Sequence, residues 1–299
     1  MDDIDISSEV KDAITERRPV VALESTLITH GFAYPRNIEI AIDIQDVVRQ
    51  AGALPATIAV LGGKVTIGLS TEQLQHLATT HDARKCSTRD LGLVAGLGLD
   101  GSTTVAATMF IAARAGISVF ATGGIGGVHR GHPFDVSADL TELGRTPVTV
   151  VCAGPKALLD LPLTLEHLET LGVPVITYES DDIPAFYSRS SGLRADIRVD
   201  TPANLAAIIR ARRALQLPGG ELVCVPVPKE SELSRDTAET AIRAAQQMAD
   251  DLGIHGAAAT PFMLEEIAKR TKGASMLANI ALLLNNAHVA AMLAIALCA

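Results

Sequence analysis

Short apolar runs alternate with longer amphipathic stretches from one end of the chain to the other. Unbroken apolar runs are typical of strands that are buried on both faces of a sheet. These runs occupy residues 19–23, 56–61, 65–67, 117–121, 148–152, 173–177 and 222–225. Gly62 and Gly63 separate two of the runs, which predicts a hairpin at that point.

The stretches between the apolar runs have helical spacing and helix-capping residues. Ser70 and Gln73 form a capping box, and Ile38, Ile42 and Val47 follow Pro35 at helical intervals. Further helices are predicted for residues 104–115, 163–171, 202–215, 232–252, 261–270 and 275–296. Alternation of strands and helices predicts an α/β fold, with a mostly parallel sheet flanked by helices on both faces as an α/β/α sandwich. No linker divides residues 1–299, so we expect one domain.

Composition and charge exclude several classes of protein. The net charge is −9, aromatic residues make up 3% of the chain and Trp is absent, which argues against binding of polymeric nucleic acid. An acidic chain can still hold a local basic pocket for a small anion. The cysteines Cys86, Cys152, Cys224 and Cys298 form no metal-binding or redox motif, so we expect reduced thiols in a cytosolic protein.

Neither end of the chain predicts a membrane segment. The first residues, MDDIDISSEVKD, are acidic and lack the apolar stretch of a signal peptide. Residues 273–299 contain no Asp, Glu, Lys or Arg, but Asn279, Asn285, Asn286 and His288 interrupt the apolar pattern. We therefore expect the last helix to lie in the protein core.

Glycine-rich segments mark possible ligand contacts. Residues 96–101 match G-x-G-x-x-G and precede a predicted helix, but no acidic residue follows within the distance that a dinucleotide site requires. Residues 101–104 offer either backbone N–H groups for an anion at a helix N-terminus or an N-cap at Ser102 or Thr103. Residues 122–131 carry glycines followed by His129 and Arg130, and this loop favours close approach to a ligand.

Reactive side chains lie in the segments that follow predicted strands, in loops 24–30, 122–139 and 153–156, where α/β proteins bind ligands. Glu24 is a candidate general acid or a structural carboxylate, and Lys156 is a candidate amine nucleophile or a surface lysine. Asp135 and Asp139 could bind Mg²⁺ or Mn²⁺, most simply with one carboxylate and several waters. Alternatively, Asp139 or Ser137 caps a short helix.

Segments spread along nearly the whole chain resemble the pseudouridine-5′-phosphate glycosidase family. They include ALESTLITHGFAYPRN, GALPATIAVLGGKVTIGLS, GSTTVAATM, FATGGIGGVHRG, DVSADLTELGRTPVTVVCAG, PAFYSRSSG and LANIALLLNNA. The resemblance implies cleavage of the carbon–carbon bond between uracil and ribose 5-phosphate. It implies that Lys156 bonds covalently to C1′ of the ring-opened sugar, that Glu24 donates a proton and that Asp135 anchors a manganese ion.

The same resemblance implies the remaining site residues and the assembly. Substrate contacts match Lys85, Val105, Thr122, His129, Ser137, Ala138, Asp139 and Asn279. The family implies a homotrimer that binds a small-molecule substrate. The composition and the terminal segments predict a cytoplasmic protein that binds neither polymeric nucleic acid nor a membrane. The chain departs from the family pattern at Pro155, at Val225, at Ala257 and in a short loop over residues 129–135.

Two other functions are compatible with the residues taken alone. A Schiff-base aldolase acting on another sugar phosphate would also use Lys156 and a phosphate site, but it would not bind uracil. A non-catalytic sensor of a sugar phosphate would need neither a nucleophile nor an acid at the ends of its strands. Analysis of the products separates the first alternative from the glycosidase, and binding without turnover would indicate the second.

Overall fold

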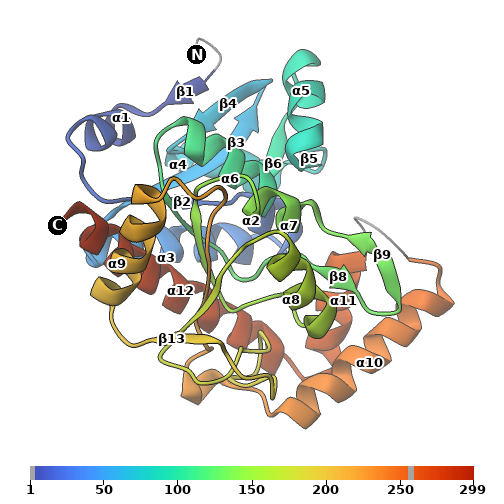
Figure 1. The fold of residues 1–299 in the computed structure, drawn as a ribbon. Coiled ribbons are helices and arrows are strands. Elements are labelled where there is room, and N and C mark those ends of the chain that lie inside the picture. The colour runs from blue at the N-terminus through green and yellow to red at the C-terminus, as the bar shows by residue number, and fades with distance from the viewer. Residues whose placement is uncertain (1–3, 255–258) are drawn as a thin grey trace.

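The computed structural model describes residues 4–254 and 259–299. A large sheet crosses the molecule in the order β1-β4-β3-β2-β7-β10-β14-β12-β13, and β6, which pairs with β5, joins it at β3 (Figure 1). Its strands are β1 (Ile4–Ile6), β2 (Val20–Leu23), β3 (Leu54–Leu61), β4 (Lys64–Ile67), β5 (Arg84–Cys86), β6 (Gly101–Thr103), β7 (Val119–Ala121), β10 (Thr149–Cys152), β12 (Val175–Tyr178), β13 (Ile197–Val199) and β14 (Leu222–Cys224).

Strand pairing in this sheet is parallel except where β3 meets β4 and β6. The antiparallel pair β3–β4 is the hairpin predicted around Gly62 and Gly63. A separate antiparallel sheet contains β11 (Leu159–Asp160), β8 (Val128–His129) and β9 (His132–Val136). The prediction of a mostly parallel sheet is therefore confirmed.

Alternate residues of the central strands point to two different hydrophobic cores. Val21 and Leu23 join a core that contains side chains of α3 (Arg36–Gln50), α9 (Pro202–Ala214), α10 (Arg235–Asp251), α11 (Ala259–Arg270) and α12 (Ala274–Cys298). Val20 and Ala22 join the opposite core, with α1 (Ser8–Thr15), α6 (Val105–Arg114), α7 (Ala138–Leu143) and α8 (Leu161–Thr170). Burial on both faces explains why β2, β7 and β14 are apolar at every position.

Shorter helices complete the fold. They are α2 (Thr26–His30), α4 (Thr71–Thr79), α5 (Thr88–Gly96) and the 3-10 helix η1 (Lys229–Ser231). The capping box predicted for Ser70 and Gln73 is present at the start of α4. In α3 the predicted apolar stripe is partly wrong, because Ile42 is exposed and the core stripe consists of Ile40, Ile44 and Val48.

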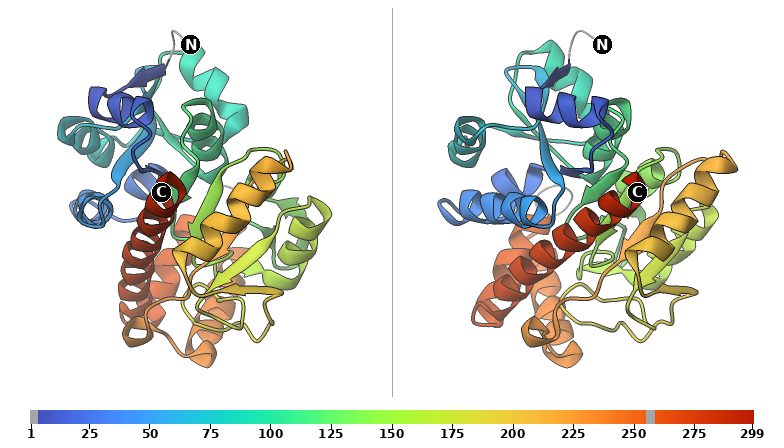
Figure 2. Two further views of the ribbon diagram at one scale, coloured as in Figure 1. Left: turned by 60° about the vertical axis from the view of Figure 1, so that its left-hand side comes forward. Right: turned by 90° about the vertical axis from the view of Figure 1, so that its left-hand side faces the viewer.

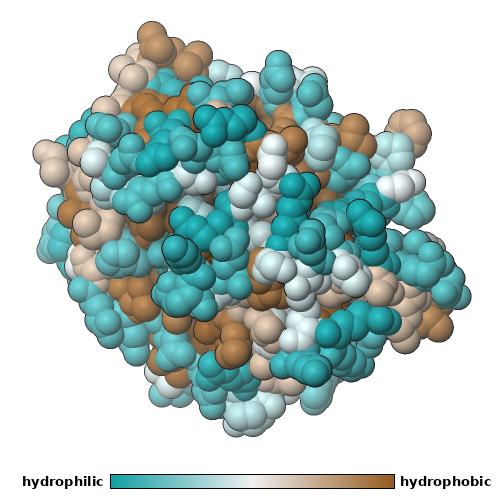
Figure 3. Space-filling view, turned by 90° about the horizontal axis from the view of Figure 1, so that it is seen from below, coloured by the Kyte–Doolittle hydropathy of each residue, from teal (hydrophilic) through white to brown (hydrophobic). Residues whose placement is uncertain are grey.

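The apolar helix α12 is long enough to cross a membrane by length and composition, yet it packs on one face of the sheet beside α9 (Figure 2). It contacts β2, β7 and β10, and 56% of its most apolar window is buried. Such burial supports the predicted core helix. On the face drawn in Figure 3, hydrophilic residues cover most of the surface, and hydrophobic residues lie between them in separate groups.

Candidate active site

The carboxyl ends of β2, β7 and β10 meet at one edge of the sheet. These strands are neighbours, with Leu23 opposite Ala121 and Ala121 opposite Val151. The chain continues from them into Glu24, into Thr122 and into the segment that contains Lys156. The predicted strand-end residues are therefore brought together by the register of three parallel strands, although long stretches of sequence separate them.

Glu24 is a buried carboxyl group at the end of β2. Burial raises its pKa above the ordinary glutamate value, while the charge of Lys156 and a hydrogen bond from Thr122 oppose that shift. Asp139 raises the pKa further and Lys85 lowers it. A carboxyl group with a raised pKa is suited to donate a proton near neutral pH, which is the role expected of Glu24.

Two lysines lie near this carboxyl group and line the same cavity. Lys85 lies on β5, and burial together with the charge of Lys156 lowers its pKa, whereas Glu24 and Asp139 act in the opposite direction. Lys156 is half-buried, and its backbone N–H donates to the carbonyl of Ile125 at 3.0 Å. Pro155 is unexpected from the family pattern. It pairs with Ile125 as a parallel bridge and so fits against the glycine loop, residues 122–131.

One cavity contains the main candidates. Five of the predicted site residues line it: Glu24, Lys85, Thr122, Lys156 and Asn279. The remaining lining residues are Thr26, Leu27, His30, Gly31, Phe32, Gly123, Gly124, Phe186, Leu264 and Leu283. The cavity therefore combines an acid, two amines and an amide with an apolar wall, which suits a polar ligand with one flat or apolar part.

Two of these lining residues, His30 and Phe186, were missed by the sequence reasoning. Burial and the charge of Lys85 lower the pKa of His30, whose Nδ1 lies 2.5 Å from the hydroxyl oxygen of Thr29. Phe186 has a φ of 60°, which is rare for a residue with a side chain. A Cβ on Gly124 would lie 2.7 Å from the Phe186 ring, so the glycine permits their close approach. His30 ends a loop already expected at the site, and Phe186 lies in PAFYSRSSG, a segment that resembles the family, but neither residue was given a role.

Asp139 binds two backbone groups from separate segments. Its carboxylate accepts hydrogen bonds from the N–H of Ala106 at 2.9 Å and from the N–H of Gly126 at 2.8 Å. It thus joins the first turn of α6 to the glycine loop. Ser137 caps α7, as the alternative prediction proposed, and it accepts a hydrogen bond from the N–H of Asp139.

The start of α6 differs from the prediction. Residues 101–103 form strand β6, and Thr104, not Ser102 or Thr103, is the N-cap. The G-x-G-x-x-G match at 96–101 therefore runs from the end of α5 into a strand, which is not the context of a dinucleotide fingerprint. Asp139 already binds the N–H of Ala106 in the first turn, which leaves fewer donors for an anion than expected.

The β8–β9 hairpin carries the predicted histidine and the predicted metal ligand. Burial lowers the pKa of His129, and the nearby charge of Asp135 opposes the shift. Asp135 itself is exposed. Among residues 4–254 and 259–299, no three His, Cys, Asp or Glu side chains group closely enough to hold a metal ion. The donors present therefore fit a hydrated ion on one carboxylate, and they do not form an all-protein cage.

The other predicted contacts do not line this cavity. Val105 is buried at the start of α6, Ser137 is half-buried and Ala138 is exposed. Val225 is buried, and its N–H donates to the carbonyl of Cys152 at 2.8 Å, so valine is compatible with this backbone. Ala257 lies outside the described residues.

Sequence comparison relates the chain to known proteins over nearly its full length. Residues 9–296 match the family described as Indigoidine synthase A like protein. The chain is 54% identical to the pseudouridine-5′-phosphate glycosidase of Caldanaerobacter subterraneus subsp. tengcongensis, over 98% of this chain and 96% of the relative. It is also 54% identical to that of Paracoccus denitrificans, over 98% of each chain.

Solved structures give the same relationship. The prealnumycin C-glycosynthase AlnA, in complex with ribulose 5-phosphate, superposes with a TM-score of 0.91 at 40% identity, covering 99% of this chain and 97% of that one. An indigoidine synthase A-like protein from Thermotoga maritima also has a TM-score of 0.91, at 34% identity and with the same coverage. Similarity of this extent includes both the sheet and the loops at its carboxyl edge.

Proposed function

The chain belongs to the Indigoidine synthase A like protein family, and from that membership we propose that it is a pseudouridine-5′-phosphate glycosidase. The substrate would be pseudouridine 5′-phosphate and the products uracil and ribose 5-phosphate. The structural observation that carries the proposal is the shared cavity of Glu24 and Lys156. An acid and an amine that face one ligand are the two groups that this reaction requires.

The substrate explains why an amine is needed. Ordinary glycosidases protonate an oxygen leaving group and use a second carboxylate as nucleophile or base. In pseudouridine the sugar is joined to carbon C5 of uracil, and carbon is a poor leaving group. An amine that bonds to C1′ provides a nitrogen lone pair that can drive the separation of C1′ from C5.

We propose the following order of steps. Glu24 transfers its proton to the ring oxygen as the C1′–O4′ bond breaks, and the nitrogen of Lys156 bonds to C1′. The nitrogen then gives up a proton to the carboxylate of Glu24, and its restored lone pair forms an iminium with C1′ as the C1′–C5 bond breaks. The electrons of that bond leave with uracil, which takes up a proton at C5 from Glu24. Water adds to the iminium and releases ribose 5-phosphate and the free lysine.

Charge around the cavity supports these roles. Lys156 lies close enough to Lys85 for its charge to lower the pKa of Lys85, so the cavity brings two amines together, and a nucleophilic amine must be uncharged. The substrate phosphate carries about two negative charges at neutral pH. Lys85 and His129 would bind it. Manganese, if present, would be held by Asp135 and water and would supply further positive charge there.

The test uses the purified full-length protein with pseudouridine 5′-phosphate and manganese. We expect release of free uracil, measured by chromatography, and we expect Lys156→Ala to abolish it. Lys269→Ala is a control, because Lys269 is an exposed lysine on α11 that pairs with Glu265 and Glu266 and does not line the cavity. Uracil release by Lys156→Ala at the unmodified rate would eliminate the covalent step.

One comparison favours a reaction that also runs in the direction of synthesis. The related AlnA is named a C-glycosynthase and was solved with a pentulose phosphate. Incubation with uracil and ribose 5-phosphate should therefore yield pseudouridine 5′-phosphate, whereas a Schiff-base aldolase would give another product and a sensor none. Cytoplasmic location, a homotrimer and a single domain stay predictions.

A further inference from the structure

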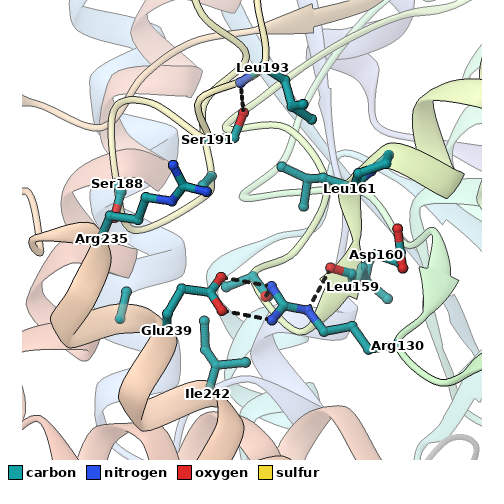
Figure 4. A pocket seen from close by; sticks show the side chains of 14 residues that line it. Arg130, Leu159, Asp160, Leu161, Ser188, Ser191, Leu193, Arg235, Glu239 and Ile242 are labelled. Atoms are coloured by element: carbon teal, nitrogen blue, oxygen red, sulfur yellow. Dashed lines mark hydrogen bonds and ion pairs between the residues drawn. The ribbon is translucent and has the colours of Figure 1, made fainter.

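Arg130 reaches from the β8–β9 hairpin to the chain segment that follows Lys156 (Figure 4). Its Nε donates to the carbonyl of Leu159 at 3.0 Å, and its guanidinium also donates to the carbonyl of Ala157 at 3.1 Å. One side chain thus binds two backbone carbonyls, one and three positions after Lys156. A planar guanidinium suits this task because its donors have a fixed geometry.

Glu239, on α10, holds the guanidinium in this position. Its two oxygens accept hydrogen bonds from the two terminal nitrogens of Arg130 at 2.9 and 3.0 Å, as Figure 4 shows. Hydrogen bonding to Arg130 lowers the pKa of Glu239, so the carboxylate is charged at neutral pH. The side chains are 29% and 31% exposed, and bidentate pairs shielded in this way are stronger and more specific than exposed ones.

The backbone around Lys156 is held on its other side by the glycine loop. The N–H of Lys156 donates to the carbonyl of Ile125, and Leu159 pairs with His129 between β11 and β8. The carbonyl of Lys156 accepts a hydrogen bond from the N–H of Leu159 at 3.0 Å. Arg130 therefore completes a set of contacts that fixes the backbone from which the proposed nucleophile projects.

We propose that Arg130, oriented by Glu239, is a positioning residue that holds Lys156 at bonding distance from C1′ of the sugar. The inference rests on the proposed function, since it concerns the same amine. Arg130 does not line the cavity that contains Lys156. It acts through the backbone of residues 157–159, and a displacement of about 1 Å in such a segment can lower a rate by about 100-fold.

The surroundings of the pair favour positioning over packing. Arg130 and Glu239 line a second cavity, of about 370 Å³, together with apolar groups such as Leu161 and Ile242 (Figure 4). A side chain at the wall of an open cavity can be shortened without leaving an empty space in the core. The Arg130→Lys variant keeps the charge but cannot bind two carbonyls and both carboxylate oxygens at once.

The experiment measures formation of the Lys156 adduct directly. The full-length protein is incubated with ribose 5-phosphate, whose open-chain aldehyde reacts with the amine to form an imine and water, and borohydride reduces the imine to a stable amine detected by mass. We expect Arg130→Lys to form the adduct about 100-fold more slowly at saturating sugar phosphate. In uracil release we expect kcat to fall with little change in KM.

A second variant and a matched control make the result specific. Glu239→Gln leaves Arg130 in place but removes its charged partner, so its adduct formation should also slow. Arg212→Lys is the control, because Arg212 also pairs with a glutamate, Glu221, and with a backbone carbonyl, that of Pro218. Arg212 lies on α9, and Glu221 directly precedes β14, so the pair lies at the amino end of that strand, whereas the cavity lies at the carboxyl ends of the strands. Loss of the Arg212–Glu221 pair should therefore lower the melting temperature without changing kcat.

The results separate the positioning role of Arg130 from the covalent step at Lys156. Adduct formation at the unmodified rate in Arg130→Lys or Glu239→Gln overturns the positioning role and leaves the proposed function intact. An equal loss of kcat in Arg212→Lys also overturns it, because general destabilisation would then explain the effect. If the unmodified protein forms no adduct at Lys156, the covalent step of the proposed function fails, and the positioning role fails with it.

Discussion

The hydroxyl of Thr122 donates a hydrogen bond to the buried carboxylate of Glu24, joining the ends of β7 and β2 inside the candidate cavity. This bond favours the charged form of Glu24 and so opposes the effect of burial on its pKa. Removing the hydroxyl should raise that pKa further. Thr122 therefore contributes, after burial and the charge of Lys156, to the range of pH over which Glu24 holds its proton.

We predict that Thr122→Val moves the pH profile of uracil release. A proton donor must be protonated, so activity falls as the pH rises through its pKa. Because the variant lacks the bond that lowers the pKa of Glu24, the falling limb of kcat/KM should move to higher pH. Thr122→Ser keeps a hydroxyl and should retain the unmodified profile. An unchanged falling limb in Thr122→Val would show that Glu24 does not control it.

Glu24→Gln should lower uracil release by about 10²–10⁴-fold, the usual contribution of a general acid. It should also change the dependence of stability on pH. Burial raises the pKa of Glu24 in the folded protein, so stability is lost as the pH rises from the ordinary glutamate range through the raised pKa. Glu24→Gln lacks this loss. Between about pH 5 and about pH 8, the melting temperature of the unmodified protein should therefore fall more than that of the variant.

Gly126→Ala should distort the contact between the glycine loop and α7. A Cβ at this position would lie 2.2 Å from the hydroxyl oxygen of Ser137 and 2.9 Å from a carboxylate oxygen of Asp139. We expect a loss of about 1–3 kcal/mol in the free energy of unfolding, together with lower activity. Gly92→Ala, where a Cβ meets no atom within 4 Å on α5, should instead stabilise by about 0.4–1 kcal/mol.

Asp135→Asn tests the metal proposal. The protein is treated with a chelator and manganese is then added back, with uracil release measured at each stage. We expect the unmodified protein to recover activity and Asp135→Asn to recover little, without loss of melting temperature, because Asp135 is exposed. Asp43→Asn, an exposed position on α3, is the control. Full recovery by Asp135→Asn would remove Asp135 as a ligand.

The sequence by itself predicted the central strands, the main helices and the edge of the sheet at which the site lies. These features follow from local patterns, since a run such as residues 148–152 must be buried on both faces and the next residues must leave the sheet. The β3–β4 hairpin and the capping box at Ser70 are similarly local. Of the residues expected from the family resemblance, five line a common cavity: Glu24, Lys85, Thr122, Lys156 and Asn279.

Only the tertiary structure decided how these groups are supported. The pairing of Arg130 with Glu239, 109 residues further along the chain, has no local signal in the sequence. The segment that contains Phe186 resembles the family, but it does not indicate that the Phe186 ring lines the cavity. Asp139 could have been a metal ligand or a cap, and it proved to bind backbone N–H groups from two segments. Hydrophobic periodicity specifies which face of an element is buried, but it does not specify which distant polar groups meet once the elements are packed.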